Sequence, residues 1–427
     1  MMQVREYAEL TTDKKATPSA DLAIIEQETF DWLAEFTQKE GYGRFIRYKR
    51  PQYLQLQSYV GYLQSPQGEA IEVLPKTRLG TDNPTLARQV LRKMLCSAMN
   101  VSPKEAHSAD LQRMDLPIHE WIFNQFLQAL NDLVASGLRF DYLRVEEESS
   151  FIRGQLDIAK QQRQPIGQAH RFHVRHDVYH PDRLENRLIK TALNYVQKLC
   201  KASNNWRLAN ELSHILMPIH NLTNPLIDLP KWVDSKALQS YRAIKPWCKI
   251  ILEQMNPNFQ KGSHQGIALL FPMEKLFEKH ITYCLKSKMK PPVSLLSQVR
   301  SQYMTYSKHI DLDKQRKRFN LKPDILIKKG QSHVHVMDTK WKLLNSSNDE
   351  DFGISQSDIY QLFAYGHKYL NGQGEMMLIY PKHANFNSPL DCLHFSDELR
   401  LWAVPFCIEE DRLVVGAWKD KFLALNY

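Results

Sequence analysis

Glycine is scarce in this sequence, at 16 of 427 residues, and neither GxxxxGKS nor GxxxxGKT occurs anywhere in it. A phosphate-binding loop needs those glycines because its backbone must approach the phosphates closely. We therefore expect no nucleotide-binding site in this chain. If its work needs nucleotide hydrolysis, another chain must supply it.

Cysteine pairs and long apolar runs are missing as well. The six cysteines are scattered with no CxxC pair, so the sequence suggests neither a zinc ribbon nor a disulfide framework. No stretch approaches the roughly 18 consecutive apolar residues of a membrane span. The start, MMQVREYAEL, lacks the apolar core of a secretion signal. We expect a cytoplasmic protein without a membrane partner.

Positive charge and apolar residues are present in quantity. Lysine and arginine outnumber aspartate and glutamate by 56 to 47, which gives a net charge of +9. This excess favours a polyanionic partner without naming one. Hydrophobic residues make up 43% of the chain, enough for two or three domains with proper cores.

Changes of pattern along the chain predict an α/β protein of three regions. Residues 1–85 are expected to form a small β-rich domain, because QYLQLQSYVGYLQSPQGEAIEVLPK alternates polar and apolar residues. Residues 86–265 are mainly helical, with a β-like insert, LRFDYLRVEEESSFIRGQLDIAK, and a helix predicted to open with a capping box at Asp182. The stretch KGSHQG is the expected boundary to residues 266–427, which read helix, strands, helix, strand.

A hairpin of two strands is predicted in KPDILIKKGQSHVHVMDTKWK, residues 322–342. With a three-residue loop after Lys329, Asp324 lies opposite Asp338 on one face of the sheet. The Cα atoms of such a pair are roughly 4.5–5.5 Å apart. Lys340 shares that face because strand side chains alternate. The predicted register therefore gathers two carboxylates and an ammonium into one cluster.

Two carboxylates directly opposite each other repel and destabilise a sheet, whereas a divalent cation between them reverses that interaction. We therefore expect Asp324 and Asp338 to bind Mg²⁺, with the Thr339 carbonyl as a further ligand. Lys340 would orient the attacking water or neutralise the charge that develops on a phosphate. The competing interpretation is a Pro-Asp turn followed by a solvated Asp338–Lys340 ion pair on an edge strand.

Supporting residues are expected on the flanking helices and just before the hairpin. Glu278, one turn from Glu274, is the candidate for a third acidic ligand, and Gln361 is the candidate to hold a water or a phosphate oxygen. For each of these two, a plain place on a helix surface is the alternative. A basic cluster is expected to bind DNA phosphates if it is not simply a solvated face. Its residues are Arg316, Lys317, Arg318 and Lys322.

These motifs together resemble a known family. PD at 323–324, DTK at 338–340, FE at 277–278 and DIYQLFAYGHKY look like the PD-(D/E)xK nuclease fold, whose central mixed sheet is flanked by helices. Together with IEVLPK, GLRFDY, IRGQLDIAK and ENRLIKTAL, they resemble the McrC subunits of McrBC-type, modification-dependent restriction systems that act in phage defence.

The resemblance implies a Mg²⁺-dependent endonuclease that cleaves double-stranded DNA carrying modified cytosine, such as 5-methylcytosine. It also implies a hexameric AAA+ GTPase partner, McrB-like, which binds the GTP, recognises the modified base and is stimulated by a finger that the middle and N-terminal parts project. Arg153 is the candidate stimulating residue, with a structural role as the alternative. The competing functions are a non-catalytic activator of an NTPase ring and a DNA-binding protein without chemistry.

Overall fold

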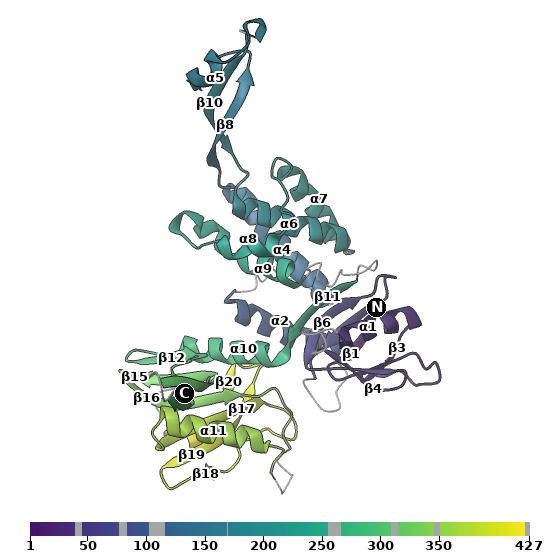
Figure 1. The fold of residues 1–427 in the computed structure, drawn as a ribbon. Coiled ribbons are helices and arrows are strands. Elements are labelled where there is room, and N and C mark those ends of the chain that lie inside the picture. The colour runs from purple at the N-terminus through teal and green to yellow at the C-terminus, as the bar shows by residue number, and fades with distance from the viewer. Residues whose placement is uncertain are drawn as a thin grey trace. The chain divides into compact units, whose positions relative to one another are not determined.

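The computed structural model describes residues 1–38, 45–76, 83–101, 116–168, 170–254, 266–308, 315–345 and 351–422 (Figure 1). By its contacts the chain divides into two compact units, residues 1–118 with 266–427, and residues 119–265. The boundary expected at residue 85 lies inside the first unit, because α2 (Pro84–Met99) packs against α10 (Met273–Lys288). The boundary expected at KGSHQG falls almost wholly outside the described residues.

The amino-terminal region contributes two four-stranded sheets to the first unit. The first sheet has the order β1 (Met2–Arg5), β7 (Ala70–Leu74), β6 (Tyr59–Gln64), β11 (Ile267–Pro272). The second has the order β3 (Leu22–Ile24), β2 (Glu9–Thr11), β5 (Tyr53–Leu56), β4 (Ile46–Arg50), with α1 (Gln27–Gln38) packed on β4. β11 approaches β6 so closely at Gly61 that a Cβ there would lie 2.0 Å from the Leu269 carbonyl oxygen.

A mixed sheet forms the carboxy-terminal part of the first unit. Its order is β12 (Val293–Ser297), β15 (Ile325–Lys329), β16 (Ser332–Thr339), β17 (Gly374–Pro381), β19 (Leu399–Cys407), β18 (Leu393–His394), with β20 (Arg412–Leu413) also paired to β19. β16, β17 and β19 run parallel, and the remaining pairs are antiparallel. A separate two-stranded sheet joins β13 (Gln302–Lys308) to β14 (Gln315–Leu321).

Helices cover both faces of the mixed sheet. On one face, Phe277 and His280 of α10 contact the ring of Phe406. On the other, Leu362 of α11 (Gln356–Tyr369) packs in a buried cluster that includes Leu401. Because strand side chains alternate, Leu401 and Phe406 of β19 point to opposite faces. The mixed α/β architecture expected of residues 266–427 is therefore present.

The second unit is mainly helical, as predicted. Its longer helices are α4 (Ile118–Ser136), α6 (Leu184–Leu199), α7 (Ser203–Ile215) and α9 (Lys245–Gln254), with a short α8 (Pro225–Asp228). The capping box expected at Asp182 is wrong. Arg183 is the N-cap of α6, and the Asp182 carboxylate instead accepts hydrogen bonds from Arg187 at 2.9 Å and from the backbone N–H of His220 at 2.9 Å.

The predicted β-like insert is a long hairpin in this unit, which we call the finger (residues 141–180). It pairs β8 (Asp141–Ser149) with β10 (Phe172–His180), adds the short β9 (Gln155–Leu156), and carries α5 (Ile158–Gln162). Figure 1 shows its strands extending away from the helices of the same unit. The hairpin arises from the middle region alone.

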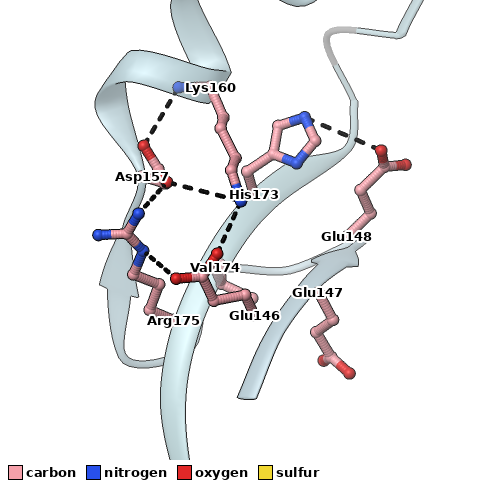
Figure 2. A pocket seen from close by; sticks show the side chains of 8 residues that line it. All are labelled: Glu146, Glu147, Glu148, Asp157, Lys160, His173, Val174 and Arg175. Atoms are coloured by element: carbon pink, nitrogen blue, oxygen red, sulfur yellow. Dashed lines mark hydrogen bonds and ion pairs between the residues drawn. The ribbon is translucent and has the colours of Figure 1, made fainter. Parts of the chain in front are cut away.

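Ion pairs hold the outer part of the finger together, since β8 has no buried residue. Arg175 binds Asp157 at 2.6 Å and Glu146 at 2.9 Å, and Lys160 binds Glu146 at 2.7 Å (Figure 2). An exposed ion pair contributes only about 0–1 kcal/mol by itself. These four side chains form one network, which fixes α5 against the strand pair.

A buried carboxylate connects the amino-terminal sheets to the carboxy-terminal part of the first unit. Glu6 is 1% exposed, and its Oε1 accepts hydrogen bonds from the indole N–H of Trp341 at 2.7 Å and the backbone N–H of Lys76 at 2.9 Å. Burial raises the pKa of Glu6 to about 7, although these hydrogen bonds lower it. In the folded protein Glu6 therefore keeps its proton in a pH range where an unfolded chain has lost it.

We expect Glu6→Gln to make stability less dependent on pH. Between pH 4.5 and 7 the unfolded carboxyl is ionised while the folded one is protonated, so the wild type loses free energy of unfolding as pH rises. Glutamine accepts the same hydrogen bonds without titrating. The variant should match the wild type near pH 4.5 and exceed it by up to about 3 kcal/mol above pH 7. Urea unfolding across this range measures the difference, with the exposed Glu28→Gln as control.

Candidate active site

The two aspartates of the predicted hairpin lie opposite each other. Ile325 of β15 pairs with Met337 of β16, which places Asp324 and Asp338 one step further along the two strands. The backbone N–H and the hydroxyl of Thr339 both donate to Asp324 Oδ2, at 2.9 and 2.8 Å. The Asp324 carboxylate is therefore fixed in direction by the residue that follows Asp338.

The turn of the hairpin differs from the prediction. Lys329 pairs with Ser332 rather than with His333, so the turn has two residues instead of three. A bulge between Ile327 and Lys328 then shifts the pairing by one residue. The shift restores the register that the three-residue loop would have produced at the aspartates.

Burial shapes the ionisation of both aspartates, and repulsion by Asp324 adds to it at Asp338. Asp338 is 2% exposed, and burial together with the charge of Asp324 raises its pKa to about 7. Burial also raises the pKa of Asp324, against the lowering effect of its bonds from Thr339. Two carboxylates that resist joint ionisation are an oxygen donor set suited to a divalent cation such as Mg²⁺.

Lys340 lies at the centre of an acidic and polar cluster. Its Nζ is 2.8 Å from Asp338 Oδ2, 3.2 Å from Asp358 Oδ1, and donates to Gln361 Oε1 at 3.0 Å. Gln361 in turn donates from its amide to the Tyr365 hydroxyl at 2.7 Å. Although burial lowers it, the pKa of Lys340 is raised overall because of Asp338 and Asp358. The ammonium is therefore charged at neutral pH.

Glu278 of α10 joins the cluster through a bridging amide. Gln298 donates from Nε2 to a Glu278 carboxylate oxygen and to Asp324 Oδ1, the latter at 3.2 Å. Burial and then the charge of Asp324 raise the pKa of Glu278 to about 7. Glu278 and Asp324 are thus bridged by one amide, and Glu278 stays a candidate for the third acidic ligand.

These side chains open into a cleft of about 660 Å³. Some of its lining residues were not identified from the sequence. Among them, Tyr7 comes from the turn after β1, Gln298 from the end of β12, and Asp358 from the first turn of α11. The lining residues are Tyr7, Glu274, Lys275, Glu278, Gln298, Lys322, Asp324, Asp338, Thr339, Lys340, Trp341, Lys342, Asp358 and Gln361.

The predicted basic cluster divides between the cleft and a neighbouring surface. Lys322 lines the cleft. Arg316, Lys317 and Arg318 are exposed on β14, where the Lys317 ammonium lies 5.4 Å from the ring centroid of Tyr303 on β13. The cluster thus offers cations both inside the cleft and on the adjoining two-stranded sheet.

Arg153 lies in the finger, in the loop between β8 and β9. Its guanidinium is paired with Glu147 of β8 and lies 5.5 Å from the ring centroid of Phe151. Phe151 and Ile152 beside it are 59% and 58% exposed. Arg153 therefore belongs to an exposed segment with apolar side chains, and its guanidinium is paired with β8 of the same hairpin.

Comparison with known proteins identifies the family. A family model described as McrBC 5-methylcytosine restriction system component matches residues 54–381. Among curated proteins no sequence matches the chain. A chain of the Thermococcus gammatolerans assembly of McrB AAA+ hexamers with bound McrC is similar in fold, with a TM-score of 0.68 and 17% identity over 100% of this chain and 99% of that one.

A second similar structure is the Thermococcus gammatolerans McrBC complex, with a TM-score of 0.50 and 18% identity over 66% of this chain and 86% of that chain. At these identities the two structures bear on the fold, whereas the family model matches most of the sequence. No described helix is long and apolar enough to cross a membrane. With the family model matched along residues 54–381, this chain belongs to the family of McrBC 5-methylcytosine restriction system components.

Proposed function

We propose that this chain is the McrC-like, DNA-cleaving subunit of its restriction system, a Mg²⁺-dependent endonuclease of the PD-(D/E)xK kind. The observation that carries the proposal is the pair of opposed carboxylates, half-buried Asp324 and buried Asp338, beside the Lys340 ammonium. Opposing two carboxylates costs folding free energy, so a scaffold has no physical reason to keep them. A site that binds a divalent cation does.

Asp324, Asp338, Glu278 and the Thr339 carbonyl would hold Mg²⁺. When bound, the ion supplies Lewis-acid stabilisation of phosphate charge and lowers the pKa of a coordinated water. Lys340 supplies a fixed positive charge. This charge stabilises the negative charge that develops on the phosphate oxygens in the transition state. Because its neighbours raise its pKa, Lys340 keeps its proton and acts as a charge stabiliser rather than as a base.

Gln361 and Asp358 position that lysine. Both sit in the first half of α11, which begins at the Ser355 N-cap, and both contact the Lys340 Nζ. The exposed cations of β14, together with Lys322, would bind DNA backbone phosphates and make affinity fall as salt rises. The presence of these cations supports double-stranded DNA as the substrate.

The GTPase partner is proposed from the family. The similar structures are of McrB AAA+ hexamers with bound McrC, and this chain would likewise dock on such a ring and stimulate its GTP hydrolysis. The finger is proposed as the docking element, because it is extended and carries exposed apolar residues. For Arg153 to reach a bound nucleotide, it would have to leave Glu147.

Reconstitution tests the proposal. The chain is mixed with an McrB-like GTPase, GTP, Mg²⁺ and methylated plasmid, and both hydrolysis of GTP and cutting of DNA are measured. We expect Asp338→Asn to abolish cutting and to leave stimulated GTP hydrolysis unchanged. Since the substitution removes the repulsion between carboxylates, the variant should unfold no more readily than the wild type. Loss of cutting would then report chemistry rather than misfolding.

Asp397→Asn, at an exposed aspartate of the same part of the fold, is the matched control and should cut normally. Stimulated GTP hydrolysis without cutting by the wild type would instead support a non-catalytic activator. DNA binding with neither reaction would support a binding protein. Normal cutting by Asp338→Asn would remove Asp338 from the site.

A further inference from the structure

A second group of metal-ligating side chains lies in the first unit, outside the cleft. His280 and Cys284 are one turn apart on α10, so they share a face, and Asp411 lies in the turn between β19 and β20. His280 Nε2 is 3.2 Å from Asp411 Oδ1 and 3.8 Å from Cys284 Sγ. One ligand atom from each of the three lies within 4.8 Å of the others.

We propose that His280, Cys284 and Asp411 bind a Zn²⁺ ion. Bonds of about 2.05 Å to nitrogen, 2.3 Å to sulfur and 2.1 Å to oxygen define a tetrahedral site. In such a site the nitrogen lies about 3.6 Å from the sulfur and about 3.4 Å from the oxygen. The observed separations of 3.8 and 3.2 Å differ from these by about 0.2 Å each. Two of the three separations thus match a zinc site, and the sulfur and the carboxylate oxygen lie within 4.8 Å of each other.

The surroundings of His280 allow its Nε2 to bind a metal. Ser97 Oγ lies 2.9 Å from the Lys93 carbonyl oxygen and 2.9 Å from His280 Nδ1. When the hydroxyl donates to that carbonyl, Nδ1 donates to Ser97 Oγ, and Nε2, which faces Cys284 and Asp411, keeps a free lone pair. Fixing the tautomer through the other ring nitrogen is what outer partners of zinc-binding histidines do.

The Asp411 carboxylate presents one oxygen to this group. Its Oδ2 lies 3.0 Å from the Lys93 ammonium, and its buried Oδ1 faces His280 Nε2 at 3.2 Å. A lone pair on Nε2 and a carboxylate oxygen at this distance repel each other unless a proton or a metal cation lies between them. A zinc ion removes that conflict.

The donor types and the burial select zinc over magnesium. A thiolate and an imidazole are softer ligands than Mg²⁺ accepts, and they suit Zn²⁺. His280 is 0% and Cys284 is 4% exposed, whereas the Asp411 side chain is 41% exposed and marks the side from which an ion and a fourth, water ligand enter. The ion would tie α10 to the turn after β19. Since α10 also carries Glu278, zinc would fix the helix that presents this side chain to the cleft.

Cobalt substitution tests the site on the whole protein. The purified chain is treated with a chelator, and Co²⁺ is added while absorption is recorded. We expect one equivalent to produce the strong ligand-field bands of a tetrahedral ion and a thiolate-to-cobalt charge-transfer band, and Zn²⁺ to abolish both. Cobalt at Asp324 and Asp338 has only oxygen ligands and gives no charge-transfer band, so the two sites are distinguished.

Variants assign the ligands. Cys284→Ser should lose the charge-transfer band, whereas Cys248→Ser, at a buried cysteine of the other unit, should keep it. Ser97→Ala should lower zinc affinity about 10- to 100-fold and keep the band at saturation. A wild type that gives no charge-transfer band, or a band that survives in Cys284→Ser, overturns the proposal. In that case His280 and Asp411 form a hydrogen-bonded pair without metal.

Discussion

Replacing Lys340 with methionine is expected to slow DNA cleavage about 100- to 1,000-fold without weakening metal binding. Methionine keeps most of the length of the side chain and removes the ammonium that lies 2.8 Å from Asp338. Loss of one preorganised charge at a developing anion costs about 100- to 1,000-fold in rate. The substitution also removes the ammonium that repels a cation bound by Asp324 and Asp338. The affinity of the site for Mg²⁺ should therefore stay constant or rise.

Two measurements separate these effects. Single-turnover cleavage at saturating Mg²⁺ gives the rate, and calorimetric titration gives the metal affinity. Both are measured well above pH 7, because loss of the ammonium raises the pKa of Asp338 further and a proton there would compete with the metal. Lys329→Met, at the exposed tip of the same hairpin, is the matched control and should cleave normally. If Lys340→Met loses metal affinity and rate together, the lysine supports the fold of the site and not its chemistry.

The hairpin could be predicted because its information is local. Alternation of apolar residues and the turn at Gly330 fix two neighbouring strands, and the register follows from the turn length. The predicted turn was one residue too long, yet Asp324 and Asp338 still face each other. The reason is the bulge after Ile327, which no local rule in the sequence indicates. The agreement at the aspartates therefore depended on two differences that cancel.

Residues brought in by tertiary contacts were harder to find. Asp358 lies three residues before Gln361 on α11, a spacing that places both on one helix face, so its role could have been inferred. Gln298 belongs to no motif and reaches Glu278 and Asp324 from the end of β12, where its φ is +55°. The pairing of β11 with β6 likewise joins segments separated by the whole second unit.

The possible zinc ligands show the same limit. The absence of CxxC pairs argued against a zinc ribbon, and that argument concerns ligands that are near one another in sequence. His280 and Cys284 have the spacing of two ligands on one helix, but the third comes from the turn after β19. Only the packing of α10 on the sheet brings Asp411 to them, and a spacing rule contains no such information.

Removal of the finger is expected to return GTP hydrolysis by the partner to the rate of the partner alone. In the finger, Asp141 pairs with His180 and Tyr142 with Tyr179, so residues 142–179 can be replaced by an Asn-Gly turn that joins facing strand ends. The contacts at the base are kept, including Arg183 to Asp141 at 3.3 Å and Asn186 to the Arg139 carbonyl at 2.9 Å.

This deletion should leave the remaining protein intact, because the ion pairs of Arg175 with Asp157 and Glu146 lie wholly within the removed segment (Figure 2). No partner of that network is left buried and unpaired elsewhere. Calorimetric titration with Mg²⁺ should give the wild-type affinity, since Asp324 and Asp338 belong to the other unit. GTP-dependent cutting should be lost with the stimulation.

Comparing Arg153→Ala with the deletion separates the effect of one side chain from that of the whole finger. Equal losses of stimulation would assign it to Arg153. Full stimulation by the finger-less chain would mean that the partner ring docks on another surface.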